Sequence, residues 1–250
     1  MGKSTHFFGQ PVYGQLIKSL DRDKIAEMSR KMGGEKYVKS FDGYVHLLTM
    51  LFAVIMRFDS LREIEAAMTA EVRKLHHLGI EKVPKRSTLS DANARRPEKF
   101  FEEVYRDLYE RNKCKPYVDI KKGRQPKLVS LLTNDFDMTL ETIVSIYRRR
   151  WQIESLFKQI KQNFPLRYFY GESYNAIKIQ IWVTLIANLL ISLPQSSLER
   201  NWSFSGLATM VRIVMMYYLN MQNFFNKPDA DLKIMLEQAS ESPPEESINE

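Results

Sequence analysis

The chain lacks cysteine pairs and long apolar runs. Its 250 residues include one cysteine, Cys114, which excludes an internal disulfide and a cysteine-rich zinc site. Residues 179–193 form the most apolar stretch, but polar side chains interrupt it. Since a bilayer-spanning helix needs about 20 mostly apolar residues, this stretch is predicted to be a buried helix, without a membrane partner. Lys3, His6 and Gln10 interrupt any apolar run at the start of the sequence, so no secretory signal is expected there. Because the chain has a single cysteine, the expected location is the reducing cytoplasm.

Common catalytic motifs are also missing. No glycine-rich phosphate loop, HExxH zinc motif or nucleophile elbow occurs in the sequence. His76 and His77 are adjacent, so they point to different sides of a helix and do not form a metal site. What the chain does have is 12% aromatic residues, typical of packed cores, and a net charge of +7. That charge favours a polyanionic partner without distinguishing nucleic acid from a membrane or ribosomal surface.

Residues 1–112 are predicted to form a wholly helical unit, because apolar residues recur every three or four positions. Residues typical of helix starts precede each run. The expected starts are Asp23 for residues 24–31, Asp42 for residues 41–58, Ser60 with Glu63 as a capping box, and Pro97 for residues 98–112.

A basic stretch lies at residues 82–96. Lys85, Arg86, Ser87 and Thr88 are predicted to lie just ahead of a helix, like the entry to a DNA-recognition helix. Cations and hydroxyls there would contact phosphates, and a helix N-terminus favours anions. The alternative is a solvated basic surface without a ligand.

The composition changes after residue 112. Residues 113–127 combine lysines and arginine with two prolines and a glycine, which indicates a basic linker. Residues 128–134 are predicted to form a short buried strand. Helices are expected at 176–193 and 204–225, and the region from 128 to 235 is treated as one unit. The acidic tail at 236–250 is predicted to be disordered.

One further helix is expected after Thr139, its predicted cap, either continuous or with a hinge near Ser145. On it, Tyr147, Arg150, Glu154 and Lys161 fall within a sector about 60° wide, at the edge of a buried apolar face. There the Glu154 carboxylate could hold a metal ion against a phosphate. Alternatively, Glu154 forms ordinary one-turn pairs with its cationic neighbours, worth about 0.2–0.5 kcal/mol each.

The spacing Tyr-x2-Arg-x3-Glu-x6-Lys resembles the pattern that ends the catalytic domain of the IS-four family of DDE transposases. The flanking residues 149–154 and 157–162 are similar to that family as well. Residues 6–13 and 85–92 resemble the helical domain that precedes the catalytic domain in these bacterial proteins. The match therefore covers two ends of the chain, roughly residues 1–112 and 128–240.

The resemblance implies a fold and a chemistry. It implies a mainly α chain, in which a helical DNA-binding domain precedes the C-terminal remnant of a ribonuclease-H-like α/β domain. In the family, two aspartates and one glutamate hold Mg²⁺ or Mn²⁺ for in-line displacement at phosphorus. Glu154 matches that catalytic, metal-binding glutamate. Tyr147, Arg150 and Lys161 would contact the DNA backbone near the cut.

The two aspartates have no counterpart. The interval in which the family carries them is reduced here to residues 113–127, whose one acid is Asp119. Asp135 and Asp137 belong to a predicted polar turn. We therefore expect an internally deleted transposase that binds no metal productively and cuts no DNA alone.

The sequence is compatible with three functions. The first is a truncated transposase of a mobile element whose remaining capacity in DNA transposition and recombination is to bind insertion-sequence ends. The second is a non-catalytic regulator that binds those ends or pairs with an intact transposase. The third is an inert remnant. For the first two, the expected location is the nucleoid of a bacterial cytoplasm.

Overall fold

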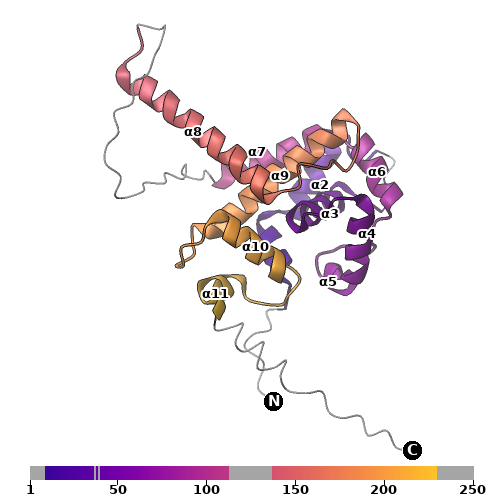
Figure 1. The fold of residues 1–250 in the computed structure, drawn as a ribbon. Coiled ribbons are helices and arrows are strands. Elements are labelled where there is room, and N and C mark those ends of the chain that lie inside the picture. The colour runs from indigo at the N-terminus through magenta and orange to yellow at the C-terminus, as the bar shows by residue number, and fades with distance from the viewer. Residues whose placement is uncertain (1–8, 37, 39, 113–136, 230–250) are drawn as a thin grey trace, which may run out of the picture.

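In the computed structural model, the described residues are 9–36, 38, 40–112 and 137–229, and within them the chain forms helices and no strand (Figure 1). The helices are α1 (Val12–Leu16), η1 (Ile17–Ser19), α2 (Arg22–Lys31), α3 (Gly43–Met56), α4 (Leu61–Ala70), α5 (Val72–His76), α6 (Arg86–Arg95), α7 (Glu98–Asn112), α8 (Leu140–Asn163), α9 (Tyr174–Gln195), α10 (Phe204–Val214) and α11 (Met221–Asn226). The mainly α class is confirmed for these residues. The predicted linker, strand and acidic tail lie outside the described residues, and the ribonuclease-H-like remnant stays a prediction.

Helix starts follow the local sequence closely. Asp42 and Ser60 cap α3 and α4 as predicted, with side-chain oxygens that accept backbone N–H groups three residues on. The predicted cap of α2 is wrong. Asp21, not Asp23, caps that helix, because its Oδ1 accepts the N–H of Lys24 at 3.1 Å. Helix α2 therefore begins two residues earlier than the sequence suggested.

The single helix predicted at 204–225 is wrong as well, since α10 ends at Val214 and α11 begins after the cap residue Asn220. The connection between α10 and α11 forms hydrogen bonds with α1. The first two N–H groups of α1, on Val12 and Tyr13, donate to the carbonyls of Tyr217 and Met215 at 2.9 and 2.8 Å. These two carbonyls lie between α10 and α11 and accept the N–H groups of α1. The helix is interrupted at this point of the chain.

Helix α9 lies at the centre of the fold, packed against α3 and α7 (Figure 1). Helix α3 is buried at every position from Gly43 to Ile55. On the α7 side, Glu98 accepts hydrogen bonds from Trp182 Nε1 at 3.1 Å and from Lys178 Nζ at 2.9 Å. A helix from the C-terminal half therefore completes the core of the N-terminal helices. The domain boundary predicted at 113–127 lies outside the described residues and stays a prediction.

The apolar helix predicted at 176–193 is α9, and it is largely buried, as expected. Among the described residues it is also the one unbent helix that is long and apolar enough to span a membrane. However, 61% of its most apolar stretch is buried inside the protein. Its apolarity is accounted for by the contacts with α3 and α7.

The buried Gln180 and the half-buried Arg212 hold the segment that leads from α8 into α9. The Gln180 amide donates to the carbonyls of Pro165 and Tyr168 at 3.0 and 2.9 Å, and accepts the N–H of Tyr170 at 2.9 Å. On α10, Arg212 donates through Nε to the Ile55 carbonyl at 2.9 Å and through Nη2 to the carbonyl of Asn163, the last residue of α8, at 3.4 Å. These bonds hold the base of α8 against the body of the protein.

Candidate functional site on helix α8

Helix α8 is a single helix of 24 residues that projects from the body (Figure 1). Thr139 caps it as predicted, since its Oγ1 accepts the N–H of Thr142 at 3.3 Å. Of the two arrangements left open by the sequence, the structure shows the continuous helix without a hinge at Ser145. The last turns pack on the body through Ile160, and Gln159 Nε2 donates to Asn188 Oδ1 at 2.6 Å.

The apolar face of α8 is exposed over most of its length, and its predicted burial is wrong there. Ile146, Ile153 and Phe157 are 52–57% exposed, whereas Ile160 and Phe164 further along the same face are buried. The reason is geometric. The helix runs past the edge of the helical body, so no described helix covers its first four turns.

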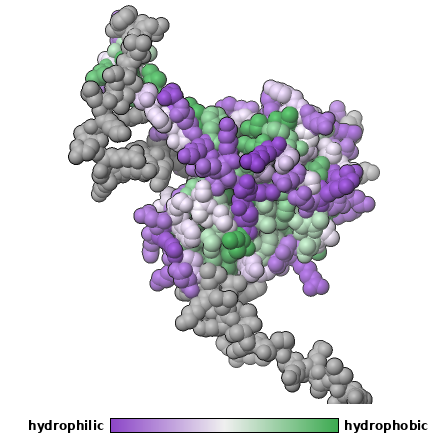
Figure 2. All heavy atoms as spheres, in the orientation of Figure 1, coloured by the Kyte–Doolittle hydropathy of each residue, from purple (hydrophilic) through white to green (hydrophobic). Residues whose placement is uncertain are grey.

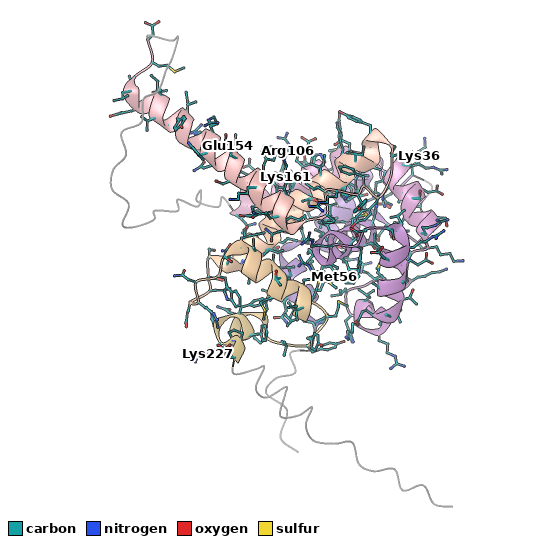
Figure 3. The ribbon with its side chains drawn as sticks, viewed as in Figure 1. Lys36, Met56, Arg106, Glu154, Lys161 and Lys227 are labelled. Carbon is teal, nitrogen blue, oxygen red and sulfur yellow. The ribbon has the colours of Figure 1, made fainter. Side chains whose placement is uncertain are left out.

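The four residues of the candidate site lie on this projecting helix, with Glu154 and Lys161 visible along it in Figure 3. Arg150 Nη1 donates to the Glu154 carboxylate one turn away. The guanidinium also lies 5.2 Å from the centre of the Tyr147 ring and 5.6 Å from that of Trp151. The result is an exposed cation flanked by two aromatic rings, a surface suited to a phosphate oxyanion.

The donor set does not fit a divalent metal centre. The Glu154 carboxylate is exposed, and its hydrogen-bonding partner is a guanidinium. Within the described ranges, no three His, Cys, Asp or Glu side chains come close enough to hold a metal ion. Mg²⁺ needs several oxygen ligands in near-octahedral geometry, which one carboxylate paired with a cation does not supply. Of the other acids considered, Asp119 and Asp135 lie outside the described residues, and Asp137 is exposed ahead of α8.

The second candidate surface is the start of α6. Lys85 is the residue before the helix, whereas Arg86, Ser87 and Thr88 form its first turn. The expectation that Ser87 and Thr88 precede the helix is therefore wrong. The helix starts earlier because the Arg86 N–H donates to Glu65 Oε2 at 2.8 Å.

The sequence gives no signal for the contact made by that carboxylate. Glu65 belongs to α4 and lies 21 residues before Arg86, so no local pattern signals the contact. It occupies one of the N–H groups to which a phosphate would bind at this helix start. The exposed cations Lys85 and Arg86 remain on the surface beside it.

A cavity of about 470 Å³ lies at the side of α6, with Thr88, Arg95 and Arg96 in its wall. Arg96 itself is buried, and it donates to the carbonyls of Gly34 at 3.0 Å and Phe41 at 2.8 Å. Burial lowers the pKa of Arg96, opposed by the nearby Glu35 carboxylate. Arg96 thus joins the loop before α3 to the end of α6, whereas Arg95 is exposed at the surface.

Comparisons with known proteins give partial matches. Residues 8–81 match the model of a domain of unknown function (DUF4372). A protein of Sinorhizobium fredii named as a transposase, y4zB, is 41% identical over 63 residues, which is 25% of this chain and 18% of the relative. A Synechocystis protein named as a transposase for insertion sequence element IS4SA is 43% identical over 53 residues, 21% of this chain and 16% of the relative.

The chain is similar in sequence to transposases of insertion sequences. A third relative, named a probable transposase for element IS5377 of Geobacillus stearothermophilus, is 29% identical over 86 residues, 34% of this chain and 23% of the relative. The chain thus matches about a fifth of the length of these curated relatives. No solved structure matches it.

Proposed function

We propose that this chain is an internally deleted derivative of an IS-four-type transposase that binds insertion-sequence ends and does not cut DNA by itself. The observation that carries the proposal is the exposed cluster on α8, in which Arg150 is flanked by two aromatic rings beside a single carboxylate. The similarity to transposases and the net charge of +7 support DNA as the polyanion.

On α8, the proposed contact is with the sugar–phosphate backbone. Arg150 presents a planar fork that can bind two phosphate oxygens at once, after exchanging its exposed bond to Glu154. Such an exposed pair is worth about 0–1 kcal/mol, so the exchange costs little. Lys161 is exposed three turns after Arg150 and adds a second positive charge along the same side of the helix. Tyr147 lies one turn before Arg150, nearer the start of α8.

A second contact is proposed at α6. Lys85 is exposed just before α6, Arg86 and Ser87 are exposed in its first turn, Thr88 is half-buried there, and Arg95 is exposed in its last turn. Contacts of this kind fix the position of a protein on DNA without reading the sequence. The Glu65 carboxylate at the helix start limits how closely a phosphate can approach.

The proposed lack of strand cleavage rests on the carboxylates. A two-metal site needs several converging acids, and Glu154 faces a guanidinium instead. The sequence offers one acid, Asp119, in the interval that would carry the family's two aspartates. No reaction step is therefore assigned to this chain.

The test is a mobility-shift titration with duplexes that carry the terminal repeats of the related elements. Exchanging Arg150 and Lys161 together for alanine is expected to weaken binding at least about tenfold at low salt, since two phosphate contacts are lost. Lys227→Ala removes an equally exposed cation from the end of α11 and serves as the control, with less than a twofold effect expected. Binding by the wild type should fall steeply by about 0.3 M salt. No binding at low salt would favour an inert remnant.

Cleavage is tested separately, by incubation of the same duplexes with Mg²⁺ or Mn²⁺. Any strand cleavage that Glu154→Gln abolishes would contradict the proposal. A second candidate function is a regulator, because a protein that binds the ends without cutting them would compete with an intact transposase. Co-expression of the two proteins, with transposition frequency as the readout, tests this function and any direct pairing between them.

A further inference from the structure

The exposed face of α8 carries the spacing of a coiled-coil seam. Ile146, Arg150, Ile153 and Phe157 follow one another at intervals of four, three and four residues, which is the a/d pattern of a heptad. Each of the three apolar side chains is more than half exposed, and Arg150 is exposed as well. The seam continues into Ile160 and Phe164, where the body of the protein already covers it.

We propose that this seam is covered by the same seam of a second copy, with the two α8 helices antiparallel. In the proposed register, Ile146 faces Phe157 of the second copy, so the numbers of any two facing residues add up to 303. Arg150 then faces Ile153 of the second copy, and both contacts occur twice by symmetry. All four seam positions are thereby used, so the surface is self-complementary, as an isologous interface requires.

The charges select the antiparallel arrangement. In a parallel pair, Arg150 would face Arg150 of the other copy inside the seam, and the like charges would repel. In the antiparallel pair, the aliphatic part of Arg150 packs on Ile153 of the second copy, and its guanidinium reaches Glu154 of that copy. The bond between Arg150 and Glu154 within one helix would then be joined by two bonds between helices.

The shape of the chain leaves room for this pairing. Residues 140–157 project from the body, about 27 Å of helix at 1.5 Å per residue. An antiparallel pair places the two bodies at opposite ends, whereas a parallel pair would bring them together at the same end. Figure 2 shows apolar side chains at the far end of this projection, away from the body. Four seam positions per copy form a small interface, so a weak dimer with a Kd of about 1–100 µM is expected.

The association is tested by sedimentation equilibrium on the full chain from about 0.1 to about 200 µM. We expect the weight-average mass to rise from 29.4 kDa toward twice that value. Ile153→Lys should keep the mass at the monomer value. Ile213→Lys, at an equally exposed isoleucine of α10, should leave the association unchanged. A wild-type chain that stays monomeric throughout, or variants with equal effects, would overturn the proposal.

The charge pairing is tested by exchange. Arg150→Glu alone and Glu154→Arg alone should each weaken the dimer at least about tenfold, because like charges then meet across the interface. The double exchange should restore it to within about threefold, since the partners are merely swapped. Circular dichroism checks that α8 stays helical in all variants. Failure of the double exchange to restore the dimer would contradict the register.

The orientation is tested by cross-linking in a Cys114→Ser background. An equimolar mixture of Ile146→Cys and Phe157→Cys chains should form a disulfide-linked pair on mild oxidation. Neither chain alone should do so, because equivalent residues in the antiparallel pair lie about 16 Å apart. Cross-linking of either variant with itself would overturn the antiparallel arrangement. In the dimer Arg150 is covered by the second copy, so pairing of the chains and phosphate binding at Arg150 exclude one another. These measurements contain no DNA and test the pairing by itself, whatever the outcome of the DNA titration.

Discussion

The side-chain amide of Asn175 lies 2.8 Å from the carbonyl oxygen of Arg96 and donates a hydrogen bond to it. The same Nδ2 donates to the Asn93 carbonyl at 2.9 Å, and Oδ1 accepts the N–H of Glu98 at 3.1 Å. One residue at the start of α9 thus satisfies the last turn of α6 and the first turn of α7. The corner between those two helices depends on a side chain nearly 80 positions away in the chain.

Asn175→Ala is therefore expected to lower the free energy of unfolding by about 2–4 kcal/mol, because several partly buried backbone groups lose their partners together. Urea denaturation followed by circular dichroism measures the change. Asn201→Ala, at an exposed asparagine, is the control and should change it by less than about 0.5 kcal/mol. Equal effects of the two substitutions would show that the Asn175 bonds do not stabilise the corner.

His46 should make the fold sensitive to mild acid. It is fully buried beside Phe101, and its Nε2 lies 2.8 Å from Asn93 Oδ1. The pKa of His46 is lowered to about 3, mainly by burial and also by the charge of Arg96, while the bond to Asn93 opposes both. Between pH 6.5 and pH 3 the unfolded chain then binds more protons at this site than the folded chain. Stability is fully present above pH 6.5 and falls as the pH drops.

The size of this effect is about 1.4 kcal/mol per pH unit below 6.5, or about 2 kcal/mol between pH 7 and pH 5. Urea titrations at several pH values in that window measure it, above the range in which carboxylates titrate. His46→Leu should abolish the slope that this site contributes, whatever it does to the stability at pH 7. His76→Gln, at an exposed histidine of α5, should leave the slope in place. A wild-type stability that is flat from pH 7 to pH 5 would rule out a buried neutral His46.

The sequence predicted what is local. Asp42, Ser60 and Thr139 were identifiable as caps because each binds an N–H group three residues on. The roles of Asn175 and Glu65 could not be predicted, since their partners lie 77 or more and 21 residues away. These contacts exist only once the helices have packed.

The same distinction applies to the candidate site. Residue spacing placed Arg150, Glu154 and Lys161 along one side of a helix, and they lie on α8 as that spacing requires. Spacing also groups Ile153 with Ile160 on one face, but it does not say whether another element covers that face. The extent of the helical body decides this, and the body ends between the two residues.

The Glu65 carboxylate offers a test of the proposed DNA contact at α6. Glu65→Gln keeps an oxygen that can accept the Arg86 N–H but removes a negative charge from the helix start. If phosphate binds near Lys85 and Arg86, the substitution should raise DNA affinity about two- to fivefold at low salt, the size expected for one exposed charge near a helix terminus. Stability should change by less than about 1 kcal/mol. Glu27→Gln, at an exposed acid of α2, is the control for net charge. If both substitutions raise the affinity equally, α6 is not the contact.

Two isoleucines on the same face of α8 distinguish burial from helix formation. Ile160 is 5% exposed and Ile153 is 54% exposed, and both lie inside the helix. Ile160→Ala should cost about 2–4 kcal/mol, because a buried side chain leaves a cavity, whereas Ile153→Ala should change stability by less than about 0.5 kcal/mol in dilute monomer. Helix propensity changes identically in the two variants, so their difference reports the packing of α8 on the body alone. Thermal or urea unfolding at about 0.1 µM, below the expected dimer Kd, measures both. A comparable loss at Ile153 under these conditions would mean that the projecting part of α8 is packed against the protein.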